Sequence, residues 1–308
     1  MNQKIISLGG ALLPSQFYPL ARRYLAWEKL RKDAKMIALI QKYYANVDID
    51  SEITEVLNHL PMCGITMHPY EWGSLFNKDY TAKFEAIEVL HDKKRRLPYT
   101  FLDGKRLYFP RSMSDYEIKR SYYGLQEIEQ HPQSPHRYLT ETFDVENDDT
   151  VVDCGVAEGN FGLNIVDRVK KLYLFEPDEI WMEPLQATFA PWGDKVVIVQ
   201  KYLSNMTDTM NISLDDYFAD KEYPTFLKLD VEGYEERLLR GAEKILSSHS
   251  IKKVATCTYH YHDDEKKLGD LLRSHGFVTT HSQGYMIVGL DDIRPPYLRR
   301  GVIRATKN

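Results

Sequence analysis

The second half of the chain alternates between two hydrophobic patterns. Short apolar runs typical of buried strands lie at residues 150–154, 171–175, 196–203, 225–231 and 251–259. Segments with helical spacing of apolar residues separate or follow them, at residues 160–170, 179–190, 233–248 and 264–275. Alternation of this kind predicts a parallel sheet with helices on both faces. Two further runs, at residues 277–280 and 285–290, flank a turn and predict an antiparallel hairpin that closes one edge of the sheet.

The first half of the chain begins with predicted helices. Apolar residues recur at roughly helical intervals from residue 18 to 45, which predicts a long amphipathic helix whose aromatic side chains pack on the core or on a second subunit. A second helix is expected from Ser51 to Leu60, because Pro61 follows. Residues 63–80 show no clear period, and a third helix is expected at residues 81–94. The basic run at residues 93–96 would then lie at a helix end, as a solvated face and not a nucleic-acid site.

A hairpin, a helix and a loop are expected ahead of the sheet. Asp103 and Gly104 supply the positive φ values of a two-residue turn between strands at residues 99–109. A helix is expected at residues 114–130, with Gly124 as a place where it can bend, followed by a proline-containing loop at residues 131–138. That loop either folds over a cofactor or is a plain linker. We therefore divide the chain into a helical segment at residues 1–110, a connection at 111–149 and an α/β domain at 150–308.

The turn after the first predicted strand has the features of a nucleotide site. Its glycines are Gly155, Gly159 and Gly162, a spacing that differs from the G-x-G-x-x-G of dinucleotide folds. Asp153 suits a ligand that carries an ammonium group and no phosphate. Glu176, at the end of the next strand, lies where a carboxylate can accept both ribose hydroxyls. An adenosine bearing an amino acid, S-adenosylmethionine, fits this pattern, although a glycine turn needed only for close packing would look similar.

Four motifs in order resemble the FkbM-type family of S-adenosylmethionine-dependent methyltransferases. They are Val-Val-Asp-Cys-Gly at 151–155, Leu-Phe-Glu-Pro at 174–177, Leu-Asp-Asp at 214–216 and Lys-Leu-Asp-Val-Glu-Gly at 228–233, the last followed by a helix with Gly-Ala at 241–242. The resemblance covers roughly residues 145–290. It departs from the family at Ala157, where asparagine is usual, and at Glu158, where an apolar residue is common.

The resemblance implies a fold and a set of cofactor contacts. The fold is α/β, a Rossmann-like class I methyltransferase fold with a mostly parallel seven-stranded sheet and a C-terminal antiparallel hairpin, preceded here by the helical segment. The cofactor is S-adenosylmethionine. The resemblance and the positions of these residues at or after strand ends lead us to expect the following cofactor contacts: Asp153, Gly155, Glu158, Gly159, Glu176, Pro177, Asp178 and Ser204.

Methyl transfer requires that the acceptor be aligned and lose its proton. Asp230 and Glu232 follow the fourth strand, and His260, whose imidazole can act as base near neutral pH, ends the fifth. We expect Asp230 and His260 to be catalytic, although Asp230 could instead orient the cofactor or the acceptor and Glu232 could be purely structural. His260 could instead merely cap its strand. His262, Asp263 and Asp264 could form a divalent-metal site with Asp230, but they are equally suited to capping a helix, so no metal is assigned.

Composition limits the classes of partner. The chain has 308 residues and a net charge of −5, which gives no electrostatic case for nucleic acid or an anionic membrane. Its three cysteines, Cys63, Cys154 and Cys257, form no paired framework and indicate a reducing, cytoplasmic location. The apolar run at residues 5–13 has no small-residue cleavage site after it, so we expect no secretion signal, and no run is long enough to span a membrane.

Three functions remain after these arguments. We expect an O-methyltransferase that acts on a hydroxyl of a sugar, polysaccharide or secondary metabolite, a small-molecule or glycan acceptor class implied by the resemblance. The alternatives are an NAD-dependent oxidoreductase and a non-catalytic S-adenosylmethionine-binding scaffold. The helices of the first segment could support a homo-oligomer.

Overall fold

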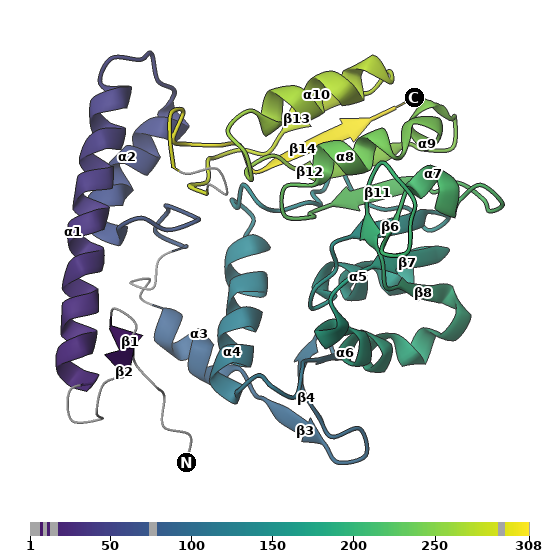
Figure 1. Ribbon diagram of the computed structural model, residues 1–308, viewed down its shortest axis with the longest axis horizontal. Coiled ribbons are helices and arrows are strands. Elements are labelled where there is room, and N and C mark those ends of the chain that lie inside the picture. Colours follow the sequence, from purple (N-terminus) through teal and green to yellow (C-terminus); the bar gives the residue numbers. More distant parts are fainter. Residues whose placement is uncertain (1–6, 9–10, 13–17, 74–78, 289–292, 308) are drawn as a thin grey trace.

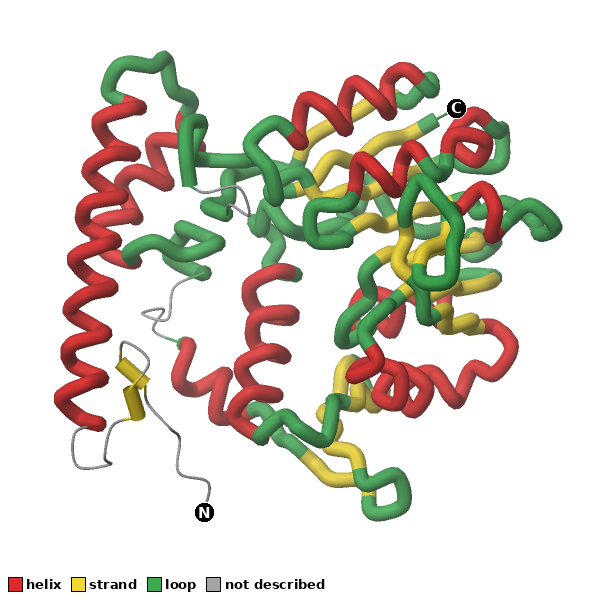
Figure 2. Tube along the Cα trace, viewed as in Figure 1, coloured by secondary structure: helices red, strands yellow, loops and turns green. Residues whose placement is uncertain are grey.

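The computed structural model describes residues 7–8, 11–12, 18–73, 79–288 and 293–307, with side chains from residue 27 onward. Most of the apolar run at residues 5–13 and the end of the strand predicted at 285–290 lie outside the described residues. Figures 1 and 2 show an α/β body and, at its left, a pair of antiparallel helices.

A seven-stranded sheet forms the centre of the α/β body. Its order is β13-β14-β12-β11-β6-β7-β8. Five strands run parallel, as predicted: β6 (Thr150–Cys154), β7 (Lys171–Phe175), β8 (Val196–Val199), β11 (Phe226–Leu229) and β12 (Lys253–Cys257). The chain builds β7 and β8 on one side of β6 and then β11 and β12 on the other, so the topological switch point lies between β6 and β11. Ligands of open α/β sheets bind at the carboxyl ends of the strands at such a point.

Successive residues of the central strand face two different cores. Val151 belongs to one hydrophobic cluster, with Phe161 of the helix after β6, while Val152 belongs to the other, with Leu239. This follows from the period of two residues in a strand, which sends neighbouring side chains to opposite faces. The helices of the body are α5 (Asn160–Ile165), α6 (Glu179–Phe189), α7 (Leu214–Tyr217), α8 (Glu235–Arg240), α9 (Glu243–Ser247) and α10 (Asp264–Ser274). Both faces of the sheet are therefore covered.

The predicted terminal hairpin was partly wrong. β13 (Val278–His281) is present, but its antiparallel partner is β14 (Val302–Thr306), which lies between β13 and β12. Residues 285–288 form no strand; Met286 makes an isolated bridge to Arg299. The turn-like residues 281–284 pointed to an immediate reversal, whereas the chain first makes an excursion toward the N-terminal helices.

The single helix predicted at residues 233–248 is broken into α8 and α9 at Gly241. A Cβ atom on Gly241 would lie 2.1 Å from the carbonyl oxygen of Ser204, so the chain approaches the loop after β9 more closely than any side chain allows. Two short parallel strands form there, β9 (Tyr202–Leu203) and β10 (Asn211–Ile212). The strand predicted at 196–203 is accordingly divided between β8 and β9.

The N-terminal segment contains the long helix that was predicted, α1 (Tyr18–Tyr44), and a second helix, α2 (Ser51–Cys63). Pro61 lies inside α2, so the expected end at Leu60 was wrong; the helix ends at Gly64, where φ is 72°. Near the start of the chain, β1 (Ser7–Leu8) pairs with β2 (Ala11–Leu12). None of the described helices is both long and apolar enough to cross a membrane.

The third predicted helix was half wrong. α3 spans Tyr80–Ala86, but the chain then forms β3 (Leu90–Asp92), which pairs with β4 (Leu97–Leu102), and β4 pairs with β5 (Lys105–Tyr108) through the predicted Asp103-Gly104 turn. The basic run at residues 93–96 is thus a turn between strands, where the Asp92 carboxylate accepts the N–H groups of Lys94 and Arg95. All four basic residues are exposed.

The helix predicted at residues 114–130 changes its winding at Gly124. An α-helix, α4 (Asp115–Tyr123), continues as a π-helix over Gly124–Glu129. Segments of this kind occur frequently at functional sites. The π-helix leads directly into the loop at residues 131–138, which returns to the sheet.

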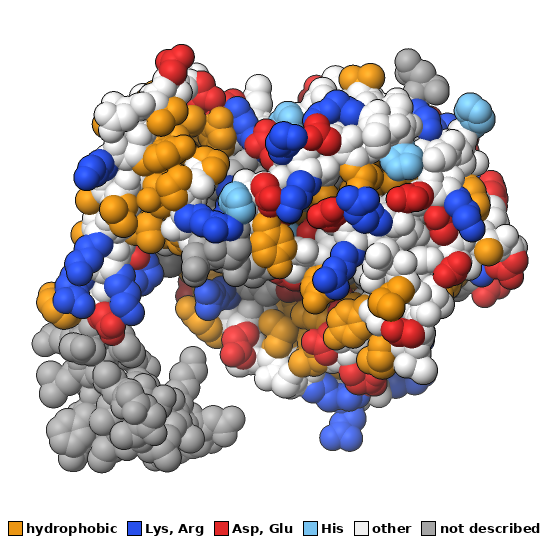
Figure 3. All heavy atoms as spheres, turned by 45° about the horizontal axis from the view of Figure 1, so that its top comes forward, with side chains coloured by type: hydrophobic (Ala, Val, Ile, Leu, Met, Phe, Trp, Pro, Cys, Tyr) orange, Lys and Arg blue, Asp and Glu red, His pale blue; other side chains and the backbone are white. Residues whose placement is uncertain are grey.

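The N-terminal helices pack mainly on the excursion before β14. Ile40, Val56 and Leu60 form a separate small core with Ile287 and Leu298. The outer side of α1 keeps Leu30 and Leu39 largely exposed. Figure 3 shows apolar side chains gathered on this part of the surface.

Candidate functional site

The first loop of the sheet lies against the end of β11 because Gly155 has no side chain. Its φ is 79°, its N–H donates to the carbonyl oxygen of Phe175, and a Cβ atom would lie 1.8 Å from the carbonyl oxygen of Asp230. The loop after β6 and the end of β11 therefore lie so close together that only glycine fits at position 155.

A pocket of about 590 Å³ opens at this rim of the sheet. Its volume lies within the range of small-molecule sites. Four residues predicted to form the site line it: Gly155, Glu176, Pro177 and Asp230. The remaining lining comes from strand ends, from β9 and β10 and from the adjoining loops, with Ala157, Phe175, Lys201, Tyr202, Leu203, Met210, Asn211, Val231, Glu232 and Tyr234.

Glu176 is held rigidly in the pocket wall. One carboxylate oxygen accepts the N–H of Ala157 at 2.8 Å, and the other accepts the N–H of Asp178 at 2.9 Å. Each oxygen keeps a further lone pair for a donor in the pocket. A contact of Glu176 with the hydroxyl groups of a ribose stays a prediction.

Asp153 lies behind the pocket and not in its lining. The carboxylate is fully buried, and Nζ of Lys228 lies 2.9 Å away. Burial raises the pKa of Asp153, although the charge on Lys228 opposes that rise. Lys228 also donates a hydrogen bond to the carbonyl oxygen of Gly155 at 2.7 Å. In this structure Asp153 therefore supports the glycine loop through Lys228, and a direct contact between Asp153 and a cofactor stays a prediction.

The other predicted cofactor residues surround the pocket without lining it. The Glu158 carboxylate accepts a hydrogen bond from the Ser121 hydroxyl and lines a second pocket of about 430 Å³ together with Glu129. Gly159 precedes α5 with a φ of 84°, and Asp178 caps α6 by accepting the N–H of Ile180. Ser204 is buried one residue beyond the lining residue Leu203.

Asp230 is the most densely contacted residue of the site. Oδ2 accepts a hydrogen bond from the Tyr138 hydroxyl at 2.6 Å and lies 3.4 Å from Nε2 of His136, while the Tyr259 hydroxyl lies 3.2 Å from Oδ1. Burial raises the pKa of Asp230, but the hydrogen bond from His136 and the charge on Lys228 outweigh it and hold the pKa far below its usual range. Asp230 is therefore an ionised, partly buried carboxylate that lines the pocket.

His260 approaches Asp230 from the other side. Nε2 lies 3.6 Å from Oδ1 of Asp230 and 3.6 Å from the Glu232 carboxylate, while Nδ1 lies 3.1 Å from the Glu235 carboxylate. Burial lowers the pKa of His260, but the close contact with Glu235 and the charges of Asp230 and Glu232 raise it overall. The two predicted catalytic residues are thus brought together, and Asp230 alone of the two lines the pocket.

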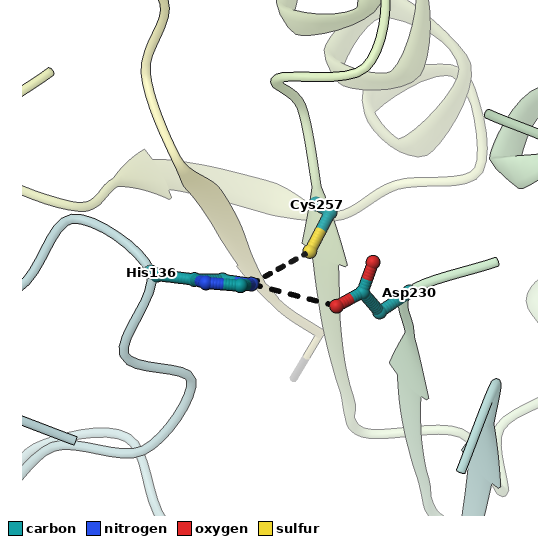
Figure 4. A group of neighbouring side chains, drawn as sticks. All are labelled: His136, Asp230 and Cys257. Atoms are coloured by element: carbon teal, nitrogen blue, oxygen red, sulfur yellow. Dashed lines mark hydrogen bonds and ion pairs between the residues drawn. The ribbon is translucent and has the colours of Figure 1, made fainter. Parts of the chain in front are cut away.

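His136, Asp230 and Cys257 bring possible metal-ligating atoms together (Figure 4). The centre of this group is filled by the Tyr138 hydroxyl, which lies 2.6 Å from Asp230 Oδ2, 3.1 Å from His136 Nε2 and 3.2 Å from Cys257 Sγ. Burial also raises the pKa of the Cys257 thiol well above its usual value, whereas a metal ligand is a thiolate. The residues therefore suit a hydrogen-bonded cluster better than a metal ion.

A second group, Asp230, Glu235 and His260, also has atoms close enough to ligate an ion. Here the two carboxylates face opposite ring nitrogens, and Oε1 of Glu235 already accepts the N–H of Val231.

The side chains of His262, Asp263 and Asp264 each contact a residue other than Asp230. Asp264 accepts the N–H of Tyr261 at 2.7 Å, Asp263 pairs with Lys267, and His262 contacts Arg294. These contacts fit local ordering of the chain before α10.

Sequence reasoning missed several residues of the site: His136, Tyr138, Lys228, Glu235 and Tyr259. Only the loop at residues 131–138 gave a signal, because its prolines suggested an ordered segment close to the sheet. Lys228 lies two residues before Asp230 on β11, and its inward position could have been inferred from a charge inside an apolar strand.

Comparisons with known proteins identify one family. The sequence model described as the methyltransferase FkbM domain matches residues 127–285. No curated protein matches the chain.

Solved structures give weaker likenesses. A methyltransferase FkbM from Methylobacillus flagellatus KT is 19% identical, with a TM-score of 0.44, over 78% of this chain and 62% of that chain. The magnesium protoporphyrin IX methyltransferase of Synechocystis PCC 6803, solved with bound S-adenosylmethionine, is 14% identical, with a TM-score of 0.35, over 52% and 71%. The tRNA m1G37 methyltransferase of M. jannaschii is 14% identical, with a TM-score of 0.39, over 72% and 60%.

The chain therefore spans less than two thirds of the length of the Methylobacillus protein. The seven-stranded sheet with its antiparallel β14 confirms the predicted Rossmann-like class I methyltransferase fold.

Proposed function

Because this chain belongs to the methyltransferase FkbM domain family, and is therefore a methyltransferase, we propose that it methylates a hydroxyl group with S-adenosylmethionine as the donor. The observation that carries the proposal is the pocket at the switch point, which combines Gly155, Glu176 and Asp230 in one wall. The acceptor class is a sugar, a polysaccharide or a secondary metabolite.

The residues around the pocket suit a nucleoside. Glu176 offers lone pairs to ribose hydroxyls, and Tyr202, Leu203 and Met210 supply an apolar surface on the adjoining wall. Most small-molecule pockets combine such apolar lining with a few fixed polar groups. The amino-acid end of the donor would lie toward Gly155 and the loop that contains Glu158.

When bound, S-adenosylmethionine supplies the methyl group to the acceptor oxygen and keeps the electron pair of the broken carbon–sulfur bond on sulfur. The ionised carboxylate of Asp230 faces the pocket and would accept the hydrogen bond of the acceptor hydroxyl, which fixes its orientation. The departing proton would pass to His260, whose Nε2 lies 3.6 Å from Oδ1 of Asp230. Positioning and proton removal are the two contributions that the protein makes.

Calorimetric titration separates this proposal from an NAD-dependent oxidoreductase. We expect S-adenosylmethionine to bind and NAD to give no heat beyond dilution. A Glu176→Gln variant should weaken S-adenosylmethionine binding by about tenfold, in line with the loss of a charge-assisted hydrogen bond. Binding of NAD without binding of S-adenosylmethionine would overturn the proposal.

Turnover separates an enzyme from a cofactor-binding scaffold. We expect S-adenosylhomocysteine to be released in the presence of hydroxyl-bearing acceptors, with losses of about 10²-fold or more for His260→Ala and Asp230→Asn. A scaffold would bind the donor and release no S-adenosylhomocysteine with any acceptor. Mass spectrometry of glycans and metabolites from cells with and without the protein would then identify the acceptor.

The remaining assignments belong to the same proposal. We assign the transferase activity to residues 150–308 and leave the helical segment at 1–110 to substrate or subunit contacts. The exposed apolar side of α1 supports a homo-oligomer, and the three free cysteines support a reducing compartment such as the cytoplasm. Light scattering would measure the oligomeric state.

A further inference from the structure

Glu235 is buried at the start of α8, directly beneath His260. Its side chain is 1% exposed, as is that of His260, and its Oε1 lies 3.1 Å from His260 Nδ1. The same oxygen accepts the N–H groups of Val231 at 2.9 Å and Gly233 at 3.4 Å. One carboxylate oxygen thus contacts both the histidine and the loop after β11.

The loop that Glu235 holds is one that the chain would not adopt without support. Glu232 has a φ of 53° and Gly233 a φ of 89°, both in the left-handed region. Such conformations persist only where surrounding contacts determine them, and they are frequent at active sites. Asp230 immediately precedes this loop, so Glu235 fixes the loop of one predicted catalytic residue and the imidazole of the other.

The contact at Nδ1 determines what the opposite nitrogen can do. A carboxylate accepts hydrogen bonds and donates none, and the carboxylate of Glu235, 3.1 Å from Nδ1, is closer to the ring than those of Asp230 and Glu232, each 3.6 Å from Nε2. A neutral imidazole in this setting carries its proton on Nδ1. Nε2 then presents a lone pair. Within the described residues neither ring nitrogen meets full hydrogen-bond geometry, and the 3.1 Å approach of Glu235 Oε1 to Nδ1 is the shortest carboxylate contact of the ring. Nε2 lies 3.6 Å from Asp230 Oδ1 and 3.6 Å from Glu232 Oε2, and these two residues line the pocket.

We infer that Glu235 is a positioning residue that holds His260 in the Nδ1–H tautomer, with Nε2 ready to receive the proton of the acceptor. The role of His260 as base rests on the proposed function. The tautomer of His260 and its contact with Glu235 can be measured without any turnover. A carboxylate behind an imidazole is a general way to orient a base and to stabilise the imidazolium that forms.

Other charged groups around His260 bear on its titration. The carboxylates of Asp230 and Glu232 face Nε2, Asp264 of α10 acts from a greater distance, and Arg299 donates to the His260 carbonyl oxygen at 2.8 Å. Burial lowers the pKa of His260, and among the groups that raise it Glu235 has the largest effect.

Nitrogen NMR of protein labelled at histidine tests the inference directly. In the wild-type protein above the pKa of His260, we expect the resonances of a protonated Nδ1 and an unprotonated Nε2. In Glu235→Gln the amide oxygen can keep the backbone bonds of Val231 and Gly233 while the charge is lost. The pKa of His260 should therefore fall by about one unit. A wild-type His260 that carries its proton on Nε2 would overturn the inference, whether or not any variant folds.

Kinetics supply the second readout and a matched control. The acid limb of the kcat profile should move to lower pH by the same amount in Glu235→Gln, with KM for S-adenosylmethionine changed less than about twofold. Glu236→Gln removes the neighbouring, partly exposed carboxylate, which pairs with Arg240, and should leave both the tautomer and the profile unchanged. Unchanged titration of His260 in Glu235→Gln would contradict the assignment. Failure to bind S-adenosylmethionine would overturn the proposed function and leave the NMR result standing.

Discussion

The hydroxyl group of Tyr138 lies 2.6 Å from Oδ2 of Asp230, although the two residues are 92 positions apart in the chain. This bond ties the loop ahead of the sheet to the end of β11. His136, from the same loop, contacts Asp230 as well, and the side chains of His136 and Tyr138 are buried. The loop is therefore joined to a residue that lines the pocket, and whether it covers a cofactor stays a prediction.

Replacing Tyr138 with phenylalanine should destabilise the protein. The ring keeps its edge-to-face contact with Phe161, but the partly buried Asp230 carboxylate loses its shortest hydrogen bond. The expected loss is about 1–3 kcal/mol of the free energy of unfolding, measured by urea denaturation. Tyr122→Phe is the control, because that hydroxyl bonds to the Phe101 carbonyl oxygen nearer the surface and should cost less than about 1 kcal/mol. Equal losses in the two variants would contradict the importance of the Asp230 contact.

Alanine at Gly155 should disrupt the site far more than alanine at Gly104. Both glycines have positive φ values, 79° and 76°, so each substitution carries a similar backbone strain of about 1–2 kcal/mol. A Cβ atom at Gly155 would also lie 1.8 Å from the Asp230 carbonyl oxygen, whereas a Cβ atom at Gly104 would meet nothing within 4 Å.

We therefore expect Gly104→Ala to lower stability by about 1–2 kcal/mol and to leave S-adenosylmethionine binding unchanged. Gly155→Ala should either fail to fold or lose binding. Circular dichroism and calorimetry on the purified variants distinguish these outcomes. A folded Gly155→Ala protein with wild-type affinity would show that the close approach to Asp230 is dispensable.

Lys228→Met should be strongly destabilising because it leaves the buried Asp153 carboxylate without its cation. Removing one partner of a buried pair typically costs about 3–5 kcal/mol. Lys170→Met breaks an exposed pair with Glu222 and should cost less than about 1 kcal/mol. Combining Lys228→Met with Asp153→Leu removes both buried charges and should restore part of the loss. Denaturation of the three variants measures the effect, and no recovery in the double variant would argue against an isolated ion pair.

The spacing of apolar residues and the turn residues predicted the strands and turns that short stretches of sequence determine. The parallel strands were found because each is an apolar run, and the Asp103-Gly104 turn because it requires two positive φ values. The break between α8 and α9 could not be found in this way, since it depends on the distance from Gly241 to Ser204, which only the folded chain creates. The pairing of β13 with β14 likewise joins segments that no local pattern connects.

The prediction of the candidate site used one rule, that ligands bind at the carboxyl ends of parallel strands. Glu176 and Asp230 line the pocket, as that rule expects, and their roles stay predictions. Asp153 does not line it: its carboxylate faces the buried Lys228, and its contact with a cofactor also stays a prediction. His136 and Tyr138 come from a loop outside the sheet, so no strand-end argument could assign them to Asp230.

Glu129 makes the stability of the fold depend on pH. It ends the π-helix, and Oε1 lies 3.9 Å from Nδ1 of His136. Burial, which outweighs the opposing charge of His136, raises the pKa of Glu129 from 4.5 to about 7. A carboxyl group whose pKa is higher in the folded state binds its proton more tightly there. Its contribution to stability is therefore fully present below about pH 4.5 and is lost as the pH rises through about 7.

Glu129→Gln should remove that dependence, because glutamine resembles the protonated acid and does not titrate. The pKa of His136 is also raised, since Glu129 and Asp230 offset the effect of its burial, so its contribution is lost in the same direction as the pH rises. From pH 4.5 to pH 8 the unfolding free energy of the wild-type protein should fall relative to Glu129→Gln by on the order of 3 kcal/mol. Urea denaturation at each pH measures the difference. Glu141→Gln, at an exposed position, should follow the wild-type curve, and a wild-type curve parallel to that of Glu129→Gln would show that Glu129 titrates alike in the folded and unfolded chains.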